Sequence, residues 1–294
     1  MLRHALRLST AILLLVLAAA QRPTAETAPA TGWLDRLNFY RASASLPPVV
    51  EDPQLSGGVR QHARYMVMHD AVKHSQNRRH SGATPEGAAA AAVSNLAAST
   101  RLTEPDSWAV DLWMQAPFHA LGILDPALNT VGFGIHREQK NRIQTAAGLD
   151  VIRGRHLAPE SVAYPIVWPA AGTTVPITSH VEEYPSPLTS CPGYKAPAGL
   201  PLIVQLGADG ELPHVTGSWI APVEDDGGEL EHCVFDGGTY RNRDAAQQQL
   251  ARTILSARNA IVLIPREPLQ PGVGYRAVVE VNGRLIDWTF GVTP

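Results

Sequence analysis

Two histidines and one acid in the first half of the chain carry side chains that can do chemistry near neutral pH. His74 and His119 lie 45 residues apart, and Glu86 lies between them. Two neutral imidazoles and a carboxylate are good ligands for zinc and leave one coordination position for water. An imidazole beside a carboxylate can also act as a general base. Both kinds of site require the two rings to converge in the fold.

Each of these residues also has a purely structural interpretation. His74 can end a helix, where the helix dipole favours a cationic side chain. Glu86 follows a Thr-Pro pair and falls in the first turn of an expected helix, where the dipole favours an acid. His119 follows Pro117 by two residues and can be a hydrogen-bonded core residue. The spacing alone leaves both interpretations open.

The composition and the missing motifs exclude several classes of protein. The chain has no H-E-x-x-H, G-x-S-x-G, P-loop or G-x-G-x-x-G motif. Hydrophobic residues make up 45% and charged residues 17%, so the chain can bury enough apolar surface to fold. The net charge of −3 argues against a nucleic-acid partner, which requires a concentrated basic surface. The histidine pair is therefore the main chemical feature of the first half.

The N-terminus has the features of a secretory signal peptide. Two arginines precede an apolar run at residues 11–17, and three alanines follow it. The run is shorter than the about 20 apolar residues of a membrane-spanning helix, although a single uncleaved anchor remains an alternative. We expect residues 1–20 to be the signal and residues 21–31 to be a linker. The mature protein is expected to be secreted, with no membrane span.

Export makes a disulfide the favoured interpretation of the two cysteines. Cys191 and Cys233 lie in the second half of a protein bound for a compartment where thiols oxidise. A bridge between them would close a loop of about 40 residues and contribute roughly 3–4 kcal/mol in the chain-entropy model. Two unpaired buried thiols are the alternative. The lack of a C-x-x-C spacing argues against a metal site made by these cysteines.

The first half has the periodicity of several helices followed by a strand. Asp52-Pro53 and Thr84-Pro85 each place an N-cap before a proline at the first helical position. The second of these pairs opens an alanine-rich stretch of high helix propensity. Alternation of apolar residues with glycines then predicts a strand. The expected helices cover residues 33–44, 53–66, 85–98 and 105–115, and the strand covers residues 131–135.

The second half is expected to be a β-sandwich. Short β-branched runs separated by glycine and proline begin near Tyr164. Asn282-Gly283 lies between two alternating runs and predicts a tight hairpin. One segment, at residues 244–257, has helical character and is expected to be a short crossover. The expected strands cover residues 202–206, 215–220, 230–235, 260–264, 275–281 and 285–290.

An ordered set of short motifs runs through the first half. In chain order they are L-N-F-Y-R at 37–41, L-P-P at 46–48, H-A-R-Y-M at 62–66, A-V-K-H at 71–74, W-M-Q-A-P-F-H at 113–119, I-L at 123–124 and V-G-F-G at 131–134. The set resembles the CAP superfamily (cysteine-rich secretory, antigen 5 and pathogenesis-related proteins) in its bacterial, cysteine-poor form. The resemblance implies an α-β-α sandwich over residues 32–137, with a cleft lined by histidines and acids.

The resemblance also implies roles for individual residues. His74 matches the first cleft histidine of the family and His119 the second, so the two rings are expected to share a cleft. Ser94 replaces the glutamate of the family's G-E-N-I element, and the second acid is missing as well. Glu86 is the nearest available acid. Asn95 is expected to line the cleft, either by holding its loops or by contacting a ligand.

The end of the chain carries a second set of family features. They are Tyr-Pro and Trp-Pro pairs at 164–165 and 168–169, a proline-rich loop at 264–272 and a closing W-T-F strand at 288–290. The set resembles bacterial Ig-like domains. The resemblance implies a β-sandwich domain over residues 164–294 with an accessory role, joined to the first domain by a junction at residues 138–163.

We therefore expect an α+β protein in which an α-β-α sandwich precedes a β-sandwich. The leading hypothesis is a secreted CAP-domain protein whose histidine-lined cleft binds a small hydrophobic ligand or a cell-envelope or extracellular partner and catalyses no reaction. The lost acids favour it, because such acids transfer protons and neutralise metal charge. The alternative is a hydrolase assisted by a divalent cation such as zinc, held by His74 and His119, with Glu86 orienting water. A purely structural cell-surface module is a third hypothesis.

Overall fold

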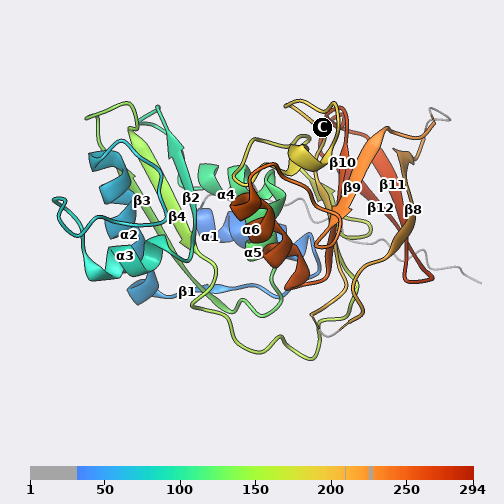
Figure 1. Ribbon diagram of the computed structural model, residues 1–294, viewed down its shortest axis with the longest axis horizontal. Helices are drawn as coiled ribbons and strands as arrows, with labels where there is room; N and C mark the ends of the chain where they lie inside the picture. The colour runs from blue at the N-terminus through green and yellow to red at the C-terminus, as the bar shows by residue number, and fades with distance from the viewer. Residues whose placement is uncertain (1–31, 209, 225–227) are drawn as a thin grey trace, which may run out of the picture.

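The computed structural model describes residues 32–208, 210–224 and 228–294. The expected signal and linker, residues 1–31, lie outside the described residues. Figure 1 shows one four-stranded sheet with its helices at one end of the molecule and two further sheets at the other. Further helices lie between these two parts (Figure 1). The arrangement agrees with the expected α+β class.

The sheet of the first half has four strands in the order β1, β3, β4, β2. β1 pairs with β3 in parallel, and the other pairs are antiparallel. β4 occupies part of the expected junction, so the junction contributes an inner strand to this sheet. The strand bounds are Val50–Glu51 for β1, Ser94–Ser99 for β2, Thr130–Arg137 for β3 and Thr145–Asp150 for β4.

The alanine-rich stretch corrects one sequence-based expectation. The helix predicted over residues 85–98 ends early, because α3 spans only Pro85–Ala91. From Ser94 the chain runs as β2, whose residues pair with β4 from Ser94↔Asp150 to Ser99↔Thr145. Helix propensity is a weak preference, and hydrogen bonding to a sheet partner overrides it here.

Helices cover both faces of this sheet. α2 (Pro53–Met68) lies against β3 and β4, and α3 lies beside α2. On the opposite face α1 (Trp33–Ala42) packs through Trp33, whose ring stacks on Phe133 of β3 at 4.6 Å between centroids. α4 (Trp108–Met114) and α5 (Pro117–Ile123) complete that layer. Two predicted caps are confirmed, since Asp52 accepts from two backbone N–H groups of α2 and Thr84 accepts from one of α3.

The glycines of the V-G-F-G motif allow the closest contact in this half. Gly132 and Gly134 of β3 face α2, while Phe133 between them faces α1. A Cβ atom at Gly134 would overlap the backbone of Arg60, and one at Gly132 would overlap the backbone of Leu55. The helix therefore lies directly on the backbone of β3, which requires glycine at both positions.

The second half contains two four-stranded sheets, ordered β5-β7-β10-β9 and β6-β12-β11-β8. The six predicted strands and the crossover helix are confirmed. The predicted hairpin is also confirmed, because Val281 pairs with Arg284 and the two residues between them have φ values of 51° and 69°. The bounds are Ile166–Trp168 (β5), Thr174–Val175 (β6), Leu202–Gln205 (β7), Val215–Pro222 (β8), His232–Asp236 (β9), Ala245–Ser256 (α6), Ala260–Pro265 (β10), Gly274–Val281 (β11) and Arg284–Val292 (β12).

The two halves share a hydrophobic core. Phe118 of α5 contacts the rings of Phe235 and Tyr240, which lie at and just after β9. At another point Trp168 is fully buried and donates its indole N–H to Ser43 Oγ at 3.0 Å, just after α1. Contacts of this kind fix the second half against the first, so residues from both can build one site.

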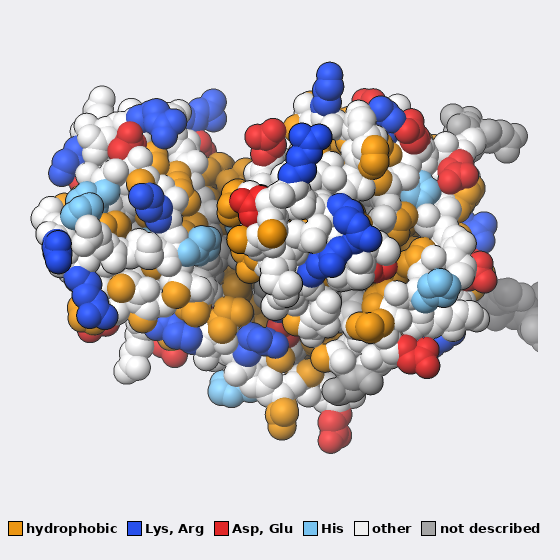
Figure 2. Space-filling model, in the orientation of Figure 1, with side chains coloured by type: hydrophobic (Ala, Val, Ile, Leu, Met, Phe, Trp, Pro, Cys, Tyr) orange, Lys and Arg blue, Asp and Glu red, His pale blue; other side chains and the backbone are white. Residues whose placement is uncertain are grey.

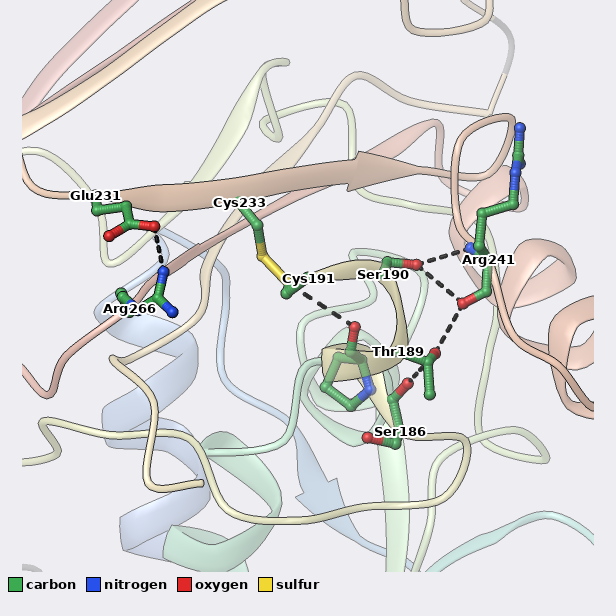
Figure 3. Close-up of a disulfide and its surroundings, with 9 residues drawn as sticks. Ser186, Thr189, Ser190, Cys191, Glu231, Cys233, Arg241 and Arg266 are labelled. Carbon is green, nitrogen blue, oxygen red and sulfur yellow. Dashed lines mark hydrogen bonds and ion pairs between the residues drawn. A yellow bond between two sulfur atoms is a disulfide. The ribbon is translucent and has the colours of Figure 1, made fainter. Parts of the chain in front are cut away.

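The predicted disulfide is present and links Cys191 to Cys233 (Figure 3). It joins the end of the short 3₁₀ helix η1 (Pro187–Ser190) to β9, with 5.5 Å between the two Cα atoms. Hydrogen bonds from Thr189 and Ser190 to the backbone oxygen of Arg241 hold the same segment from its other side. The long connection between β6 and β7 is thus attached to the body of the second half.

Candidate functional site

His119 lies at the start of α5 and is held by a carboxylate from the second half of the chain. Its Nδ1 donates to Glu183 Oε2 at 2.6 Å. The same carboxylate accepts the backbone N–H groups of Phe118 and His119 at 3.0 and 3.2 Å. The Glu183 side chain is 1% exposed, whereas the His119 side chain is 18% exposed. Glu183 therefore caps α5 and orients an imidazole whose other edge remains accessible.

The segment that supplies Glu183 is anchored at two further points. His180 donates from Nδ1 to the backbone oxygen of Gln115 at 3.0 Å, and the Val181 N–H reaches the same oxygen at 3.3 Å. Burial lowers the pKa of His180, although the nearby carboxylate of Glu183 opposes this effect. Residues 180–183 thus cross the turn between α4 and α5. We define them as the crossing segment.

Sequence reasoning missed the crossing segment. Glu183 lies 64 residues after His119 and inside the part assigned to the second domain. No short motif links the two residues, so no spacing signal could have paired them. The second half of the chain therefore supplies a carboxylate to His119.

Asn95 lies near His119 and holds its backbone. The side-chain Nδ2 of Asn95 donates to the backbone oxygen of His119 at 3.1 Å, and Asn95 is buried. The contact joins Asn95 to the residue that carries the ring, and its expected role in a cleft stays a prediction. Ser94, which replaces the family's glutamate, is also buried, and its hydroxyl has no hydrogen-bond partner among the described residues.

His74 follows α2 and is exposed. Its Nδ1 donates to the backbone oxygen of Ala91, at the end of α3, at 2.9 Å. In the described part of the chain no hydrogen bond or ring contact joins His74 to His119. His74 instead bonds to Ala91 at the end of α3, whereas the backbone of His119 is bonded by Asn95 near the start of β2.

The buried His62 positions the segment that carries His74. His62 Nε2 donates to the backbone oxygen of Lys73 at 2.9 Å, and its Nδ1 accepts from Gln76 at 3.1 Å. Burial lowers the pKa of His62 to about 4, and the positive charge available to His74 adds to this effect. His62 is therefore a neutral structural histidine on the buried face of α2.

Glu86 is an exposed residue in the first turn of α3. Within the ranges that the structure describes, its carboxylate has no hydrogen bond or ion pair with His74 or His119. Its position agrees with the structural interpretation, in which an acid near a helix N-terminus is favoured by the dipole.

Residues 34–146 match the family model of the cysteine-rich secretory protein family, CAP. The match supports the predicted CAP domain and ends inside β4, which is consistent with a first domain that extends beyond residue 137. No curated protein matches the chain.

The side chains of the CAP-like half do not fit a zinc site. Within residues 32–208, 210–224 and 228–294, no three His, Cys, Asp or Glu side chains gather so that they could hold a metal ion. Among the described residues the hydrogen-bond partners of the two rings are Ala91 for His74 and Glu183 for His119, and Glu86 is bonded to neither. Among the described residues, the metal assignment to His74 and His119 therefore lacks the cluster of ligands that it requires.

Figure 2 shows a hollow between the part of the molecule that carries α2 and α3 and the part that carries α6. Hydrophobic side chains lie on its walls. α5, which carries His119, contacts α6 on one side of this hollow.

Among the described helices none is long and apolar enough to cross a bilayer.

Proposed function

We propose that this protein is an exported CAP-domain protein that binds a small apolar ligand at the accessible edge of His119. The observation that carries the proposal is the His119–Glu183 hydrogen bond. Glu183 occupies Nδ1, so Nε2 is the ring nitrogen left to donate to or accept from a ligand. The ring is fixed before any ligand arrives, which reduces the entropy lost on binding.

Export is the second part of the proposal. The basic, apolar and small-residue pattern of residues 1–20 supports it. The Cys191–Cys233 disulfide supports it independently, because such bonds persist in oxidising compartments. The proposed ligand in that setting is a small hydrophobic molecule. A component of the cell envelope is the alternative partner that the binding experiment also tests.

Binding is favoured over hydrolysis by the state of the other candidate residues. His74 is attached to the end of α3, and Glu86 stands apart from both histidines. The acids that the family pattern places beside the histidines are replaced, and Glu183 is engaged by three N–H donors. Such a carboxylate is suited to hold His119 in place rather than to activate water.

The test is equilibrium binding of radiolabelled palmitate and cholesterol to the mature protein. We expect saturable binding of at least one of them, and His119→Gln should weaken it by about tenfold, the value of one hydrogen bond. His136→Gln is the matched control, because His136 is also part-exposed and paired with a glutamate, Glu138. The affinity of the His136→Gln variant should stay within about twofold of the wild type, which is a smaller change than the loss of one hydrogen bond causes.

Two outcomes would overturn the proposal. One is an absence of saturable binding of both probes together with saturable binding to purified cell-envelope fragments. The other is turnover of a peptide, ester or glycan that His119→Gln abolishes, which would establish catalysis at this site.

A further inference from the structure

A cavity of about 370 Å³ lies where the two halves of the chain meet, away from His119. It is bounded by the turn after α5, by the chain that follows β4, by the start of the second half and by the end of α6. Its volume falls at the lower end of the range of small-molecule sites. The lining includes Asp125, Pro126, Arg155, Leu157, Leu206 and Arg258.

Positive charge exceeds negative charge in this cavity. Asp125 is the one carboxylate among the described lining residues. Its Oδ2 accepts a hydrogen bond from Arg258 at 2.6 Å and forms an ion pair with Nε of Arg155 at 2.9 Å. The fully buried Arg41 lies behind them and donates to the backbone oxygen of Asp125 at 3.0 Å. Two guanidinium groups therefore share one carboxylate, and a third lies against the backbone of the same residue.

The charge of Arg258 is poorly compensated. Its side chain is 11% exposed, and its Nε–H is buried without a hydrogen-bond partner among the described residues. Burial lowers the pKa of Arg258; the carboxylate of Asp125 opposes this shift, and the like charge of Arg155 adds to it. A buried charged group with an unused donor is costly unless another acceptor reaches it.

The hydrogen bonding of Arg41 differs from that of Arg258. Its guanidinium donates to the backbone oxygens of Pro47, Ile123, Asp125 and Leu128, so its hydrogen bonds are used within the fold. It is a structural arginine that adds positive charge behind the cavity. Arg155 and Arg258, in contrast, line the cavity and can face a bound molecule.

The rest of the lining limits the kind of anion. Proline, alanine and leucine side chains make up much of the wall, and they offer no hydrogen bonds to a fully polar ion. A planar carboxylate matches the donor geometry of arginine, while an apolar body matches the remaining wall. We propose that this cavity binds a small organic acid, whose carboxylate contacts Arg155 and Arg258 and whose apolar part lies against Pro126, Leu157 and Leu206.

The test is isothermal titration calorimetry of the mature protein with sodium benzoate. We expect benzoate to bind. Benzyl alcohol, which has a similar shape but no charge, should bind at least about tenfold more weakly, because it cannot accept a charge-assisted hydrogen bond. Inorganic phosphate serves as the test of a site for a purely polar anion and should bind more weakly than benzoate.

Arg155 is the position for substitution, because its side chain is 41% exposed and its loss should not prevent folding. Arg155→Gln should weaken benzoate binding by about tenfold or more, and Arg155→Lys, which keeps the charge but not the planar fork, should lie between. The matched control is Arg142→Gln, which removes the same charge from an arginine that is 75% exposed and outside the cavity. It should leave benzoate binding unchanged.

The proposal is overturned if benzoate fails to bind at millimolar concentrations, or if Arg155→Gln and Arg142→Gln bind it equally. Phosphate that binds as tightly as benzoate would overturn the assignment to an organic acid. Benzoate binding should persist in His119→Gln, which separates this site from the one at His119.

Discussion

Glu183 and His119 meet across the boundary between the two halves of the chain. One carboxylate accepts the imidazole Nδ1–H and two backbone N–H groups of α5. The CAP-like half supplies the ring and the second half supplies its partner. The accessory part of the chain therefore takes a direct part in building the candidate site.

Substitution of Glu183 should destabilise the fold as well as release His119. In Glu183→Gln an amide NH₂ replaces one oxygen, and at least one of the three N–H donors then loses its acceptor. We expect a loss of about 2 kcal/mol in the free energy of unfolding, the cost of an unsatisfied buried donor. Chemical denaturation measures it. Glu182→Gln, at the exposed neighbour, is the control and should change stability by less than about 0.5 kcal/mol.

Gly134 should not tolerate even one added methyl group. In Gly134→Ala the new Cβ would overlap the backbone of Arg60, and α2 would have to move away from β3. We expect a loss of about 3 kcal/mol or more, as for an overpacked core. Gly57→Ala is the matched variant, because a Cβ there meets nothing within 4 Å. It lies inside α2 and should stabilise the protein by about 0.5–1 kcal/mol. Equal melting temperatures for the two variants would contradict the close contact of α2 and β3.

Local signals in the sequence predicted most of the fold. The cap-and-proline pairs before α2 and α3 determine where these helices begin, and they are confirmed because capping depends on neighbours in sequence. The same applies to the turn at Asn282-Gly283, whose left-handed backbone favours these residue types. The Ig-like family of the second half stays a prediction.

Two strands of the first sheet were not predicted, because they depend on pairing between residues that are far apart in the sequence. Ser94–Ser99 is rich in alanine and small residues, and only its pairing with Thr145–Asp150 makes it a strand. Thr145–Asp150 lies within the polar stretch predicted to be a junction, and its sequence T-A-A-G-L-D has little β-propensity. These segments form strands because of their neighbours in space.

The candidate site was predicted in part. The motif at residues 113–119 led to His119, and the accessible ring agrees with that choice. Convergence with His74 was expected from the family resemblance alone, and no direct contact joins the two rings in the described residues. The partner that His119 does have, Glu183, comes from the crossing segment, which no motif connects to the first half.

The disulfide should contribute strongly to the stability of the second half. Cys191 and Cys233 are separated by 42 residues, and the double variant Cys191→Ser/Cys233→Ser releases that loop in the unfolded chain. We expect a loss of roughly 3–4 kcal/mol, measured by chemical denaturation without reductant. Reductant should lower the melting temperature of the wild type and leave that of the double variant unchanged. An unchanged melting temperature of the wild type in reductant would contradict a stabilising role of the disulfide.

Buried His62 should make the protein less stable in mild acid. Burial lowers the pKa of His62 to about 4, against about 6.5 in the unfolded chain. Between these values the unfolded chain binds a proton that the native protein does not, so the free energy of unfolding falls as pH falls from 6.5 to 4. His62 should account for a loss of the order of 3 kcal/mol over this window, and the lowered pKa of His180 acts in the same direction. Denaturation at several pH values measures the slope. His62→Gln should flatten it, and the exposed His156→Gln should reproduce the wild-type slope. Equal slopes for wild type and His62→Gln would show that another group carries the acid sensitivity.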